Sequence, residues 1–190
     1  MFKAQALTEL HDGRRAAEPA SELWRAIEDN HRNNCLLWDE EDLARRKSVP
    51  DAEIAKNKRA IDGYNQKRND AIERIDEHLL SSFPEKKGNA RLSSETAGAM
   101  TDRLSILSLK IHHMRLQTLR SDVDSAHIET CKLKLNRLNE QRADLASCLD
   151  RLLDECMRGE SHFKVYRQFK MYNDPALNPA MYGEKSGEKR

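Results

Sequence analysis

The segment 102–119 contains the densest run of apolar side chains in a chain that is otherwise strongly polar. On a helix of about 100° per residue, these side chains cover most of the circumference, which is typical of a helix packed on several sides. They are Leu104, Ile106, Leu107, Leu109, Ile111, Met114, Leu116 and Leu119. Only Ser105, Ser108 and His112 form a narrow polar strip. We therefore expect this helix to lie at the centre of the fold.

Two cations lie inside the apolar arc of this helix. Arg103 and Lys110 are seven residues apart, beside Leu107 and Met114 rather than on the polar strip. Burying an unpaired charge is costly, so cations in a core need partners or neutralisation. We interpret Arg103 and Lys110 as a buried cationic cluster and as the best indication of a functional site.

The composition favours a helical protein with an ion-paired surface. Hydrophobic residues make up 38% of the 190 residues and aromatic residues 5%, which suits helices better than a sheet. The 33 basic and 32 acidic residues nearly cancel, which argues against a nucleic-acid-binding protein. Residues 1–20 show no signal-peptide pattern, and no segment approaches the ~20 apolar residues of a membrane span. We expect a cytoplasmic protein whose four cysteines are reduced thiols.

Hydrophobic periodicity predicts four long helices joined by two short links and one longer loop. The expected helices lie at about 20–47, 51–82, 96–121 and 124–158, and the long loop at 83–95. The last helix has the most regular three- and four-residue spacing, which is typical of a helical bundle or coiled coil. The sequence therefore predicts an all-α fold, an elongated antiparallel up-down-up-down four-helix bundle.

The two ends of the chain have weaker patterns than this bundle. Residues 1–18 are expected to be a weakly ordered N-terminal segment, and residues 19–182 a single helical-bundle domain. Within that domain, the aromatic-rich segment 163–182 predicts a short helix followed by an extended strap laid on the bundle. Residues 183–190 are mostly polar, so we expect a disordered tail.

The antiparallel arrangement predicts which polar residues of different helices lie at the same level. Arg103 would face Arg142 across the 121–124 link, and Asp76 across the longer loop. A second layer, about 10 Å along the axis, would contain His31, Lys110 and either Arg68 or Asn69. The complete candidate site comprises Arg103, Lys110, Arg142, Asp76, Asn65, Asn69, His31, Asn34, Asn89, Arg91 and Glu95.

This candidate site supports two interpretations. Two arginines at one level repel unless an anion lies between them, and guanidinium groups match the oxygens of phosphate or carboxylate. Asn34, Asn65 and Asn69 could hydrogen-bond sugar hydroxyls, so one hypothesis is an anionic, sugar-like or phosphorylated ligand. The alternative is a structural ion-pair network in a non-catalytic interaction or scaffold protein, with 163–182 as the surface for a protein partner.

Neither a metal site nor a catalytic pair can be assembled from the sequence. Glu28 and His31 match the E-x-x-H motif of di-iron bundles. The only possible partner, Asp124 with His127, lies at the other end of the predicted bundle, many residues from the level of His31. The serines of the apolar helix do not lie in a nucleophile turn. We therefore predict no metal and no cofactor, and the sequence leaves open whether the protein is an enzyme.

Several segments are similar to a known family. Leu37–Asp42, Asn65–Asp70, Asp102–Leu107 and Tyr166–Pro175 resemble a bacterial family known as domain of unknown function 4254, and the resemblance extends over about 20–182. It implies a single cytoplasmic helical domain. It also implies an association with genes for cell-surface polysaccharide or heptose-transfer enzymes, but no assigned activity and no mechanism.

Overall fold

The computed structural model describes residues 2–14, 21–168, 171 and 174–181, and nearly all of its regular structure is helical. The helices are α1 Ala4–His11, α2 Glu22–Ala44, α3 Asp51–Ser82, α4 Ala97–Thr118 and α5 Ser125–Met157. Two short strands, β1 Arg91–Leu92 and β2 Ser161–His162, pair in parallel. The prediction of an all-α fold is therefore confirmed for the described residues.

Side-chain caps define where three of the long helices begin. Thr96 accepts a hydrogen bond from the N–H of Ala99 at 3.1 Å, and Asp124 accepts one from the N–H of His127 at 2.7 Å. Ser21 caps α2 in the same way. Each cap satisfies an N–H group that the first helical turn leaves unpaired. The ends of α2 to α5 consequently fall within three residues of the boundaries predicted from the sequence.

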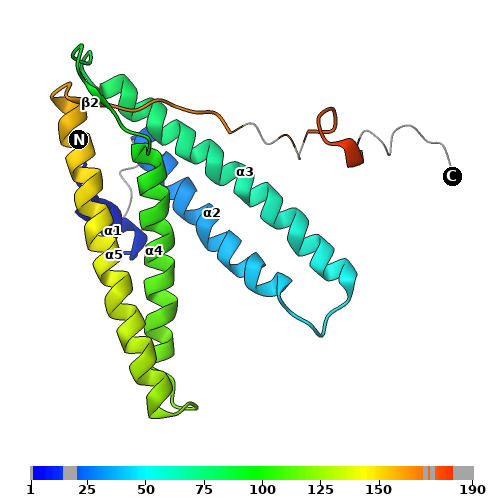
Figure 1. Cartoon of the computed structure of the whole chain (residues 1–190). Helices are drawn as coiled ribbons and strands as arrows, with labels where there is room; N and C mark the ends of the chain where they lie inside the picture. The colour runs from blue at the N-terminus through cyan, green and yellow to red at the C-terminus, as the bar shows by residue number, and fades with distance from the viewer. Residues whose placement is uncertain (1, 15–20, 169–170, 172–173, 182–190) are drawn as a thin grey trace.

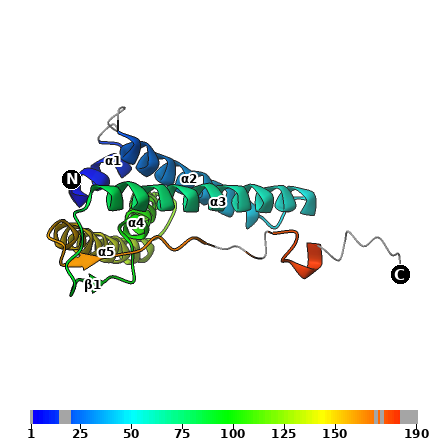
Figure 2. The ribbon, with the colours of Figure 1, turned by 90° about the horizontal axis from the view of Figure 1, so that it is seen from above.

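The four long helices form two antiparallel hairpins, α2–α3 and α4–α5 (Figure 1). The hairpins pack together where α3 ends and α4 begins, and they diverge toward their linking loops, 45–50 and 119–124. Seen from above, the α2–α3 hairpin extends away from the α4–α5 pair (Figure 2). The four helices therefore share a common core near one end. A bundle that is continuous along all four helices, as the periodicity predicts, is not confirmed.

An additional helix, α1, differs from the expectation of a weakly ordered segment over 1–18. Its buried residues are Ala4, Leu7, Leu10 and His11. The N–H of Ala4 donates to Asp150 Oδ1 at 2.8 Å, which attaches α1 to α5. A helix of eight residues is marginal in isolation and too short to show a clear period. Packing against α4 and α5 therefore stabilises α1.

The hydrophobic core lies where the two hairpins and α1 meet. Its large members include Leu7, Trp24, Ile27, Ile75, Leu79, Met100, Leu104, Leu145, Leu149, Leu152, Leu153 and Phe163. Burying one such side chain contributes about 1.5–3 kcal/mol. The distal part of the α4–α5 hairpin adds little, because Leu116, Leu119 and Leu133 are 48%, 73% and 70% exposed. The fold is therefore stabilised mainly at the end where the hairpins cross.

The segment after β2 begins in the core and then follows α3. Phe163 is buried, and its ring packs edge-on against Phe83 with the centroids 6.0 Å apart. Arg167 forms ion pairs with two glutamates of α3, whereas Tyr166 is 63% exposed. The remaining aromatic residues of the predicted strap, Phe169, Tyr172 and Tyr182, lie outside the described residues, as does the predicted tail 183–190. The aromatic strap is therefore not confirmed.

A close contact between α3 and α4 fixes where the hairpins cross. The N–H of Gly98 donates to Asp76 Oδ1 at 2.6 Å. A Cβ atom at Gly98 would lie 2.6 Å from the carbonyl oxygen of Ile72 and 2.9 Å from the Asp76 carboxylate. Carbon atoms cannot approach a rigid backbone oxygen so closely, so only glycine fits at this position. Gly98 therefore allows α4 to begin directly against α3.

Replacing Gly98 with alanine should destabilise the protein by about 1–3 kcal/mol, because the added methyl group would force α4 away from α3. Gly63, in the exposed middle of α3, is the matched control, since an added Cβ there meets nothing within 4 Å. Gly63→Ala should stabilise the fold by up to about 1 kcal/mol through the higher helix propensity of alanine. Urea denaturation measures both changes. Equal effects of the two substitutions would show that the crossing at Gly98 does not constrain the fold.

Candidate ligand-binding site

Helix α4 buries Ser105 and Ser108 of its polar strip, whereas His112 and the two cations of the apolar arc are exposed. Ser105 and Ser108 are 0% and 4% exposed, and the neighbouring Asp102 is 8% exposed. The Arg103 side chain is 56% exposed, and Lys110 is also exposed. The interpretation of Arg103 and Lys110 as buried cations is therefore wrong. The physical reason is that the short side chains of Ser105 and Ser108 let the neighbouring helices approach closely, and α2 supplies hydrogen-bond partners for Asp102 and Ser105.

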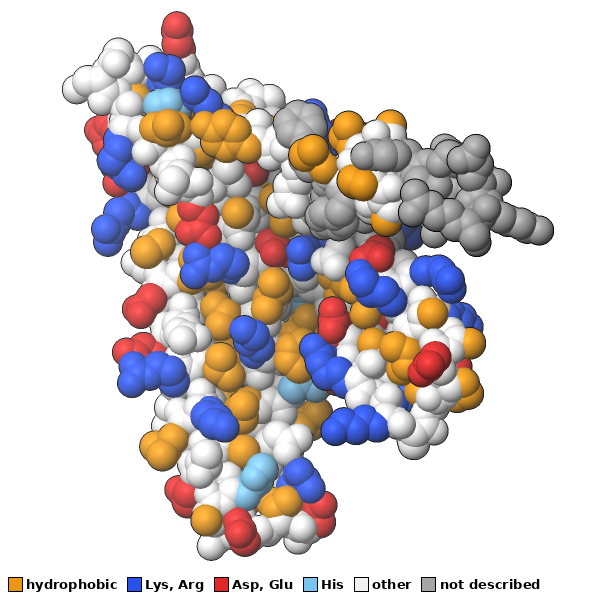
Figure 3. Space-filling model, turned by 45° about the vertical axis from the view of Figure 1, so that its right-hand side comes forward, with side chains coloured by type: hydrophobic (Ala, Val, Ile, Leu, Met, Phe, Trp, Pro, Cys, Tyr) orange, Lys and Arg blue, Asp and Glu red, His pale blue; other side chains and the backbone are white. Residues whose placement is uncertain are grey.

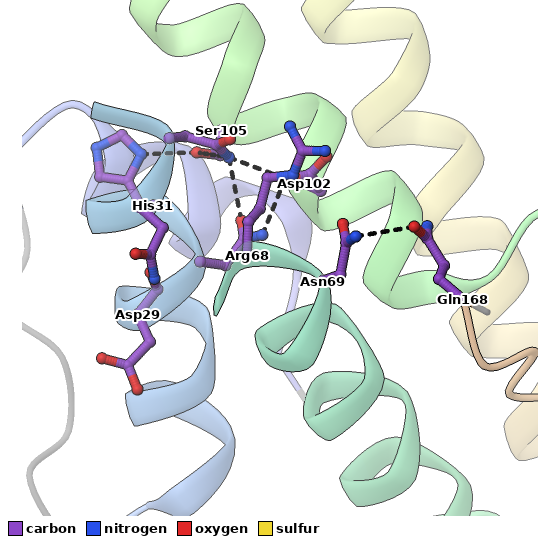
Figure 4. Close-up of polar contacts among 10 residues, drawn as sticks. Asp29, His31, Arg68, Asn69, Asp102, Ser105 and Gln168 are labelled. Carbon is purple, nitrogen blue, oxygen red and sulfur yellow. Dashed lines mark hydrogen bonds and ion pairs between the residues drawn. The ribbon is translucent and has the colours of Figure 1, made fainter. Parts of the chain in front are cut away.

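A buried hydrogen-bond network joins this strip to α2 (Figure 4). Asp102 Oδ1 accepts hydrogen bonds from Asn30 Nδ2 and Asn34 Nδ2, both at 2.9 Å. Asn34 Nδ2 also lies 3.0 Å from Ser105 Oγ, which shares a hydrogen bond of 2.8 Å with His31 Nδ1. We call these five residues the Asp102 network. Its amide donors satisfy a carboxylate that would otherwise be costly to bury.

Arg68 of α3 brings a positive charge to the same carboxylate. Its Nε lies 3.9 Å from Asp102 Oδ1, and its side chain is 27% exposed. Nε is buried without a hydrogen-bond partner, and within the described part of the chain Arg68 donates no hydrogen bond. The contact is therefore electrostatic rather than a bidentate pair, and it leaves the guanidinium group with unused donors.

An open cleft of about 280 Å³ lies next to the Asp102 network, between α2, α3 and α4. It is lined by Asn34, Leu37, Trp38, Glu41, Asp42, Arg45, Asn65, Arg68, Ile106 and Leu109. Trp38 stacks on His113, with the ring centroids 4.3 Å apart, and its Nε1 is buried without a partner among the described residues. Figure 3 shows apolar and basic side chains gathered along the groove between the two hairpins. The cleft therefore combines an apolar surface with unused polar groups.

The two arginines of the cleft differ in how closely they are paired with carboxylates. Arg45 lies 3.0 Å from Glu41 and 3.6 Å from Asp42, in ion pairs at the outer end of the cleft. Among the described residues, Arg68, at the inner end, has only the longer contact of 3.9 Å with Asp102. A ligand carboxylate or phosphate would therefore find a more available cation in Arg68 than in Arg45.

Two neutral histidines extend the Asp102 network toward α1. The rings of His11 and His31 stack with centroids 4.7 Å apart. Burial, with further contributions from His31 and Arg142, lowers the pKa of His11 to about 3. Burial also lowers the pKa of His31. Both rings are therefore neutral at pH 7, and they extend the network without adding positive charge.

The structure does not bring Asp76, Arg103 and Arg142 together as the layer prediction requires. Arg142 lies 3.0 Å from Asp12 at the end of α1, and Arg103 lies 2.5 Å from Glu95. Asp76 is buried against the first turn of α4. The reason is that the hairpins cross instead of running side by side, so residue levels cannot be transferred between them. The predicted three-residue layer is therefore wrong.

The other predicted residues do not form one cluster. His31, Asn34 and Asn65 belong to the cleft or to the adjoining network. Asn69 Nδ2 donates to Gln168 Oε1 at 2.8 Å, beside the network in Figure 4. Lys110 lines a different hollow, of about 630 Å³ between α4 and α5, together with Arg103 and Glu95. Of the loop residues, Arg91 pairs with Glu155 at 2.7 Å and Asn89 is exposed in a turn.

Sequence reasoning did not assign several residues of the site, and it gave Arg68 only as an alternative to Asn69 in the second layer. The unassigned residues are Asn30, Trp38, Asp102 and Ser105. A usable signal was present, because Asp102, Ser105 and Ser108 recur every three residues while His31, Asn34 and Trp38 follow steps of three and four. Pairing the polar strip of one helix with the polar seam of the other would have identified the contact.

Two further features bear on the possible chemistry. Among the described residues, no group of three or more histidine, cysteine, aspartate or glutamate side chains is arranged to hold a metal ion. None of the helices in the described part combines the length and the apolar character needed to cross a bilayer.

The fold and the site thus define an all-α protein whose polar network adjoins an open cleft. A family model described as "Protein of unknown function (DUF4254)" matches residues 24–165, and the chain belongs to this family. The matched region contains the cleft and the Asp102 network but not α1. No curated protein and no solved structure matches the chain.

Replacing Asp102 with alanine should destabilise the fold by about 2–4 kcal/mol, because the amides of Asn30 and Asn34 would lose their buried acceptor. Arg103→Ala, one residue further along α4, is the matched control. It should cost less than about 1 kcal/mol, since it removes only an exposed ion pair. Chemical denaturation gives both values. A larger loss for Arg103→Ala than for Asp102→Ala would restore the interpretation in which Arg103 lies in the core.

The buried Asp76 should give the protein a measurable pH dependence. Burial is the main reason that its pKa rises from 3.8 to about 6. Between these values the native state binds more protons than the unfolded state, so the contribution of Asp76 to stability falls as pH rises. The full effect approaches about 3 kcal/mol above pH 6. Asp76→Asn keeps an oxygen acceptor for the N–H of Gly98, so its stability relative to wild type should increase from pH 4 to pH 6. Parallel pH–stability curves for the two proteins would contradict the assignment.

Proposed function

We propose that this protein binds a small anionic, sugar-like molecule in the cleft between α2, α3 and α4. The observation that carries the proposal is the state of Arg68. Its guanidinium group borders the cleft and makes no hydrogen bond within the described part of the chain. A phosphate or carboxylate group would provide the acceptors that this side chain lacks.

The remaining groups of the cleft suit a ligand with several hydroxyls. Asn34 donates to the Asp102 network through Nδ2, which leaves its carbonyl oxygen as an acceptor. Asn65 lines the cleft opposite the apolar side chains Ile106 and Leu109. Hydroxyl groups could bond the two amides while the carbon skeleton contacts these apolar residues and Trp38. A phosphorylated sugar would also agree with the link to cell-surface polysaccharide synthesis that the family resemblance implies.

Binding is favoured over catalysis as the role of the cleft. A serine–histidine hydrogen bond beside it joins Ser105 and His31, but Ser105 is 0% exposed. A nucleophile must reach its substrate, so this pair lacks the access that catalysis requires. We therefore propose a binding protein. In keeping with the family resemblance, we propose that it is cytoplasmic and bacterial.

Two predictions from the sequence, the aromatic strap and the continuous four-helix bundle, form part of the same proposal. Residues 163–168 follow α3, and Gln168 bonds Asn69, the neighbour of Arg68. An aromatic strap formed by 163–182 would then lie over one side of a bound ligand. Closure of the two hairpins around that ligand would give the continuous up-down-up-down bundle that the periodicity predicts.

The proposal is tested by the effect of sugar phosphates on the melting temperature at constant ionic strength. A sugar phosphate should raise the Tm of wild type, because a ligand that binds only the native state stabilises it. Arg68→Gln should weaken binding about tenfold or more, the equivalent of at least one lost charged hydrogen bond. Calorimetric titration gives the affinities directly.

Lys67→Gln removes the same charge from an adjacent, exposed position and should leave the affinity unchanged. The uncharged sugar should bind more weakly than its phosphate. Equal binding by wild type and Arg68→Gln would contradict the proposal. Absence of binding by any sugar phosphate would favour the alternative, a scaffold protein with Tyr166, 63% exposed, in its contact surface.

A further inference from the structure

A separate hollow, of about 310 Å³, lies between the C-terminal end of α1 and the C-terminal half of α4. It is lined by His11, Asp12, Gly13, Ser108, Leu109, Ile111, His112 and Arg115. Of these residues, only Leu109 also borders the cleft described above. The two hollows therefore have separate sets of polar residues, and ligands could occupy them independently.

Two polar side chains of this hollow are buried without partners. His11 is 7% exposed and Ser108 is 4% exposed. Neither ring nitrogen of His11 nor the hydroxyl of Ser108 has a hydrogen-bond partner among the described residues. Most buried polar groups in folded proteins are paired, so two such residues lining one hollow indicate a missing partner rather than a packing fault.

Within the described part of the chain, both ring nitrogens of His11 are without a partner at the buried wall of the hollow. One face of the ring is covered by His31, at 4.7 Å between centroids. The low pKa of His11, caused mainly by burial, keeps the ring neutral, so it provides one donor and one acceptor. Ser108 can also donate or accept. The buried part of the hollow thus offers hydrogen bonds without charge.

The charge of the hollow is carried by Arg115. This side chain is exposed and forms no ion pair with the described residues. The carboxylate of Asp12, in contrast, is already engaged, at 3.0 Å from Arg142 and 3.2 Å from Arg14. An incoming anion would therefore meet one available guanidinium group and a carboxylate that two arginines neutralise.

We propose that this hollow is a second binding site, for a small molecule carrying an oxyanion. Arg115 binds the phosphate or carboxylate oxygens, and Ser108 and His11 form hydrogen bonds with them or with adjoining hydroxyls. Leu109 and Ile111 contact the apolar part of the ligand. The site requires α1, because His11 belongs to that helix, and it does not depend on the function proposed for the cleft.

Calorimetric titration of the full chain with glycerol phosphate, inorganic phosphate and malonate tests this site. Saturable binding of the two phosphate compounds alone assigns a phosphate site, and binding of malonate alone assigns a carboxylate site. In either case Arg115→Gln should lower the affinity about tenfold or more, the equivalent of one charged hydrogen bond. Lys134→Gln, an exposed cation on α5, is the control and should leave the affinity unchanged.

Ser108→Ala separates a ligand contact from a structural role. Removing an unpartnered buried hydroxyl should leave the Tm of the free protein unchanged or higher, while the affinity for the anion falls. Arg68→Gln should not affect binding at this hollow, which distinguishes it from the cleft. The proposal is overturned if none of the three anions binds, or if Arg115→Gln and Ser108→Ala both bind as wild type does.

Discussion

The crossing of α3 and α4 at Gly98 is the constraint on which the rest of the structure depends. A hydrogen bond of 2.6 Å from the Gly98 N–H to Asp76 joins the end of one hairpin to the start of the other. The absence of a side chain at Gly98 lets the two backbones meet there, since a Cβ would lie 2.6 Å from the Ile72 carbonyl oxygen. Helices fixed closely at one point and inclined to one another must separate further along. The groove between the hairpins, and with it the cleft, follows from that geometry (Figures 1 and 3).

The buried Asp102 decides which face of α4 points inward. Its carboxylate receives two amide hydrogen bonds from α2 and an electrostatic contact from Arg68 of α3. Rotating α4 to turn another face inward would leave these donors without acceptors and would remove Leu104, 0% exposed, from the core. Because the amides supply most of the compensation, Arg68 keeps unused donors at the edge of the cleft. The same arrangement that stabilises the core therefore leaves a cation available for a ligand.

Much of the secondary structure could be predicted, whereas much of the candidate site could not. The bounds of α3, Asp51–Ser82, agree with the predicted helix because Pro50 and the apolar period define them locally. The site prediction failed where it assumed four parallel helix axes, along which residues of different helices can be assigned to the same height. Asn34 and Asn65 line the same cleft, and His31 adjoins it through Ser105, since these residues lie on the polar seams of the packed pair α2–α3. Arg103 and Arg142 do not meet, because Arg103 pairs with Glu95 before α4 and Arg142 pairs with Asp12 at the end of α1.

The sequence by itself determined the helical class, the ends of the four long helices and the sites of their caps. These properties depend on the order of neighbouring residues, through periodicity, propensity and local hydrogen bonds. Only the tertiary structure decided which face of α4 is buried, that the hairpins diverge, and that α1 forms a helix. Each of these depends on contacts between residues distant in sequence. Asp102 and Ser105 can be buried because α2 supplies their hydrogen-bond partners, and an eight-residue helix can be stabilised by packing. The position of the cleft belongs to this second group, since it arises from the angle at which two hairpins cross.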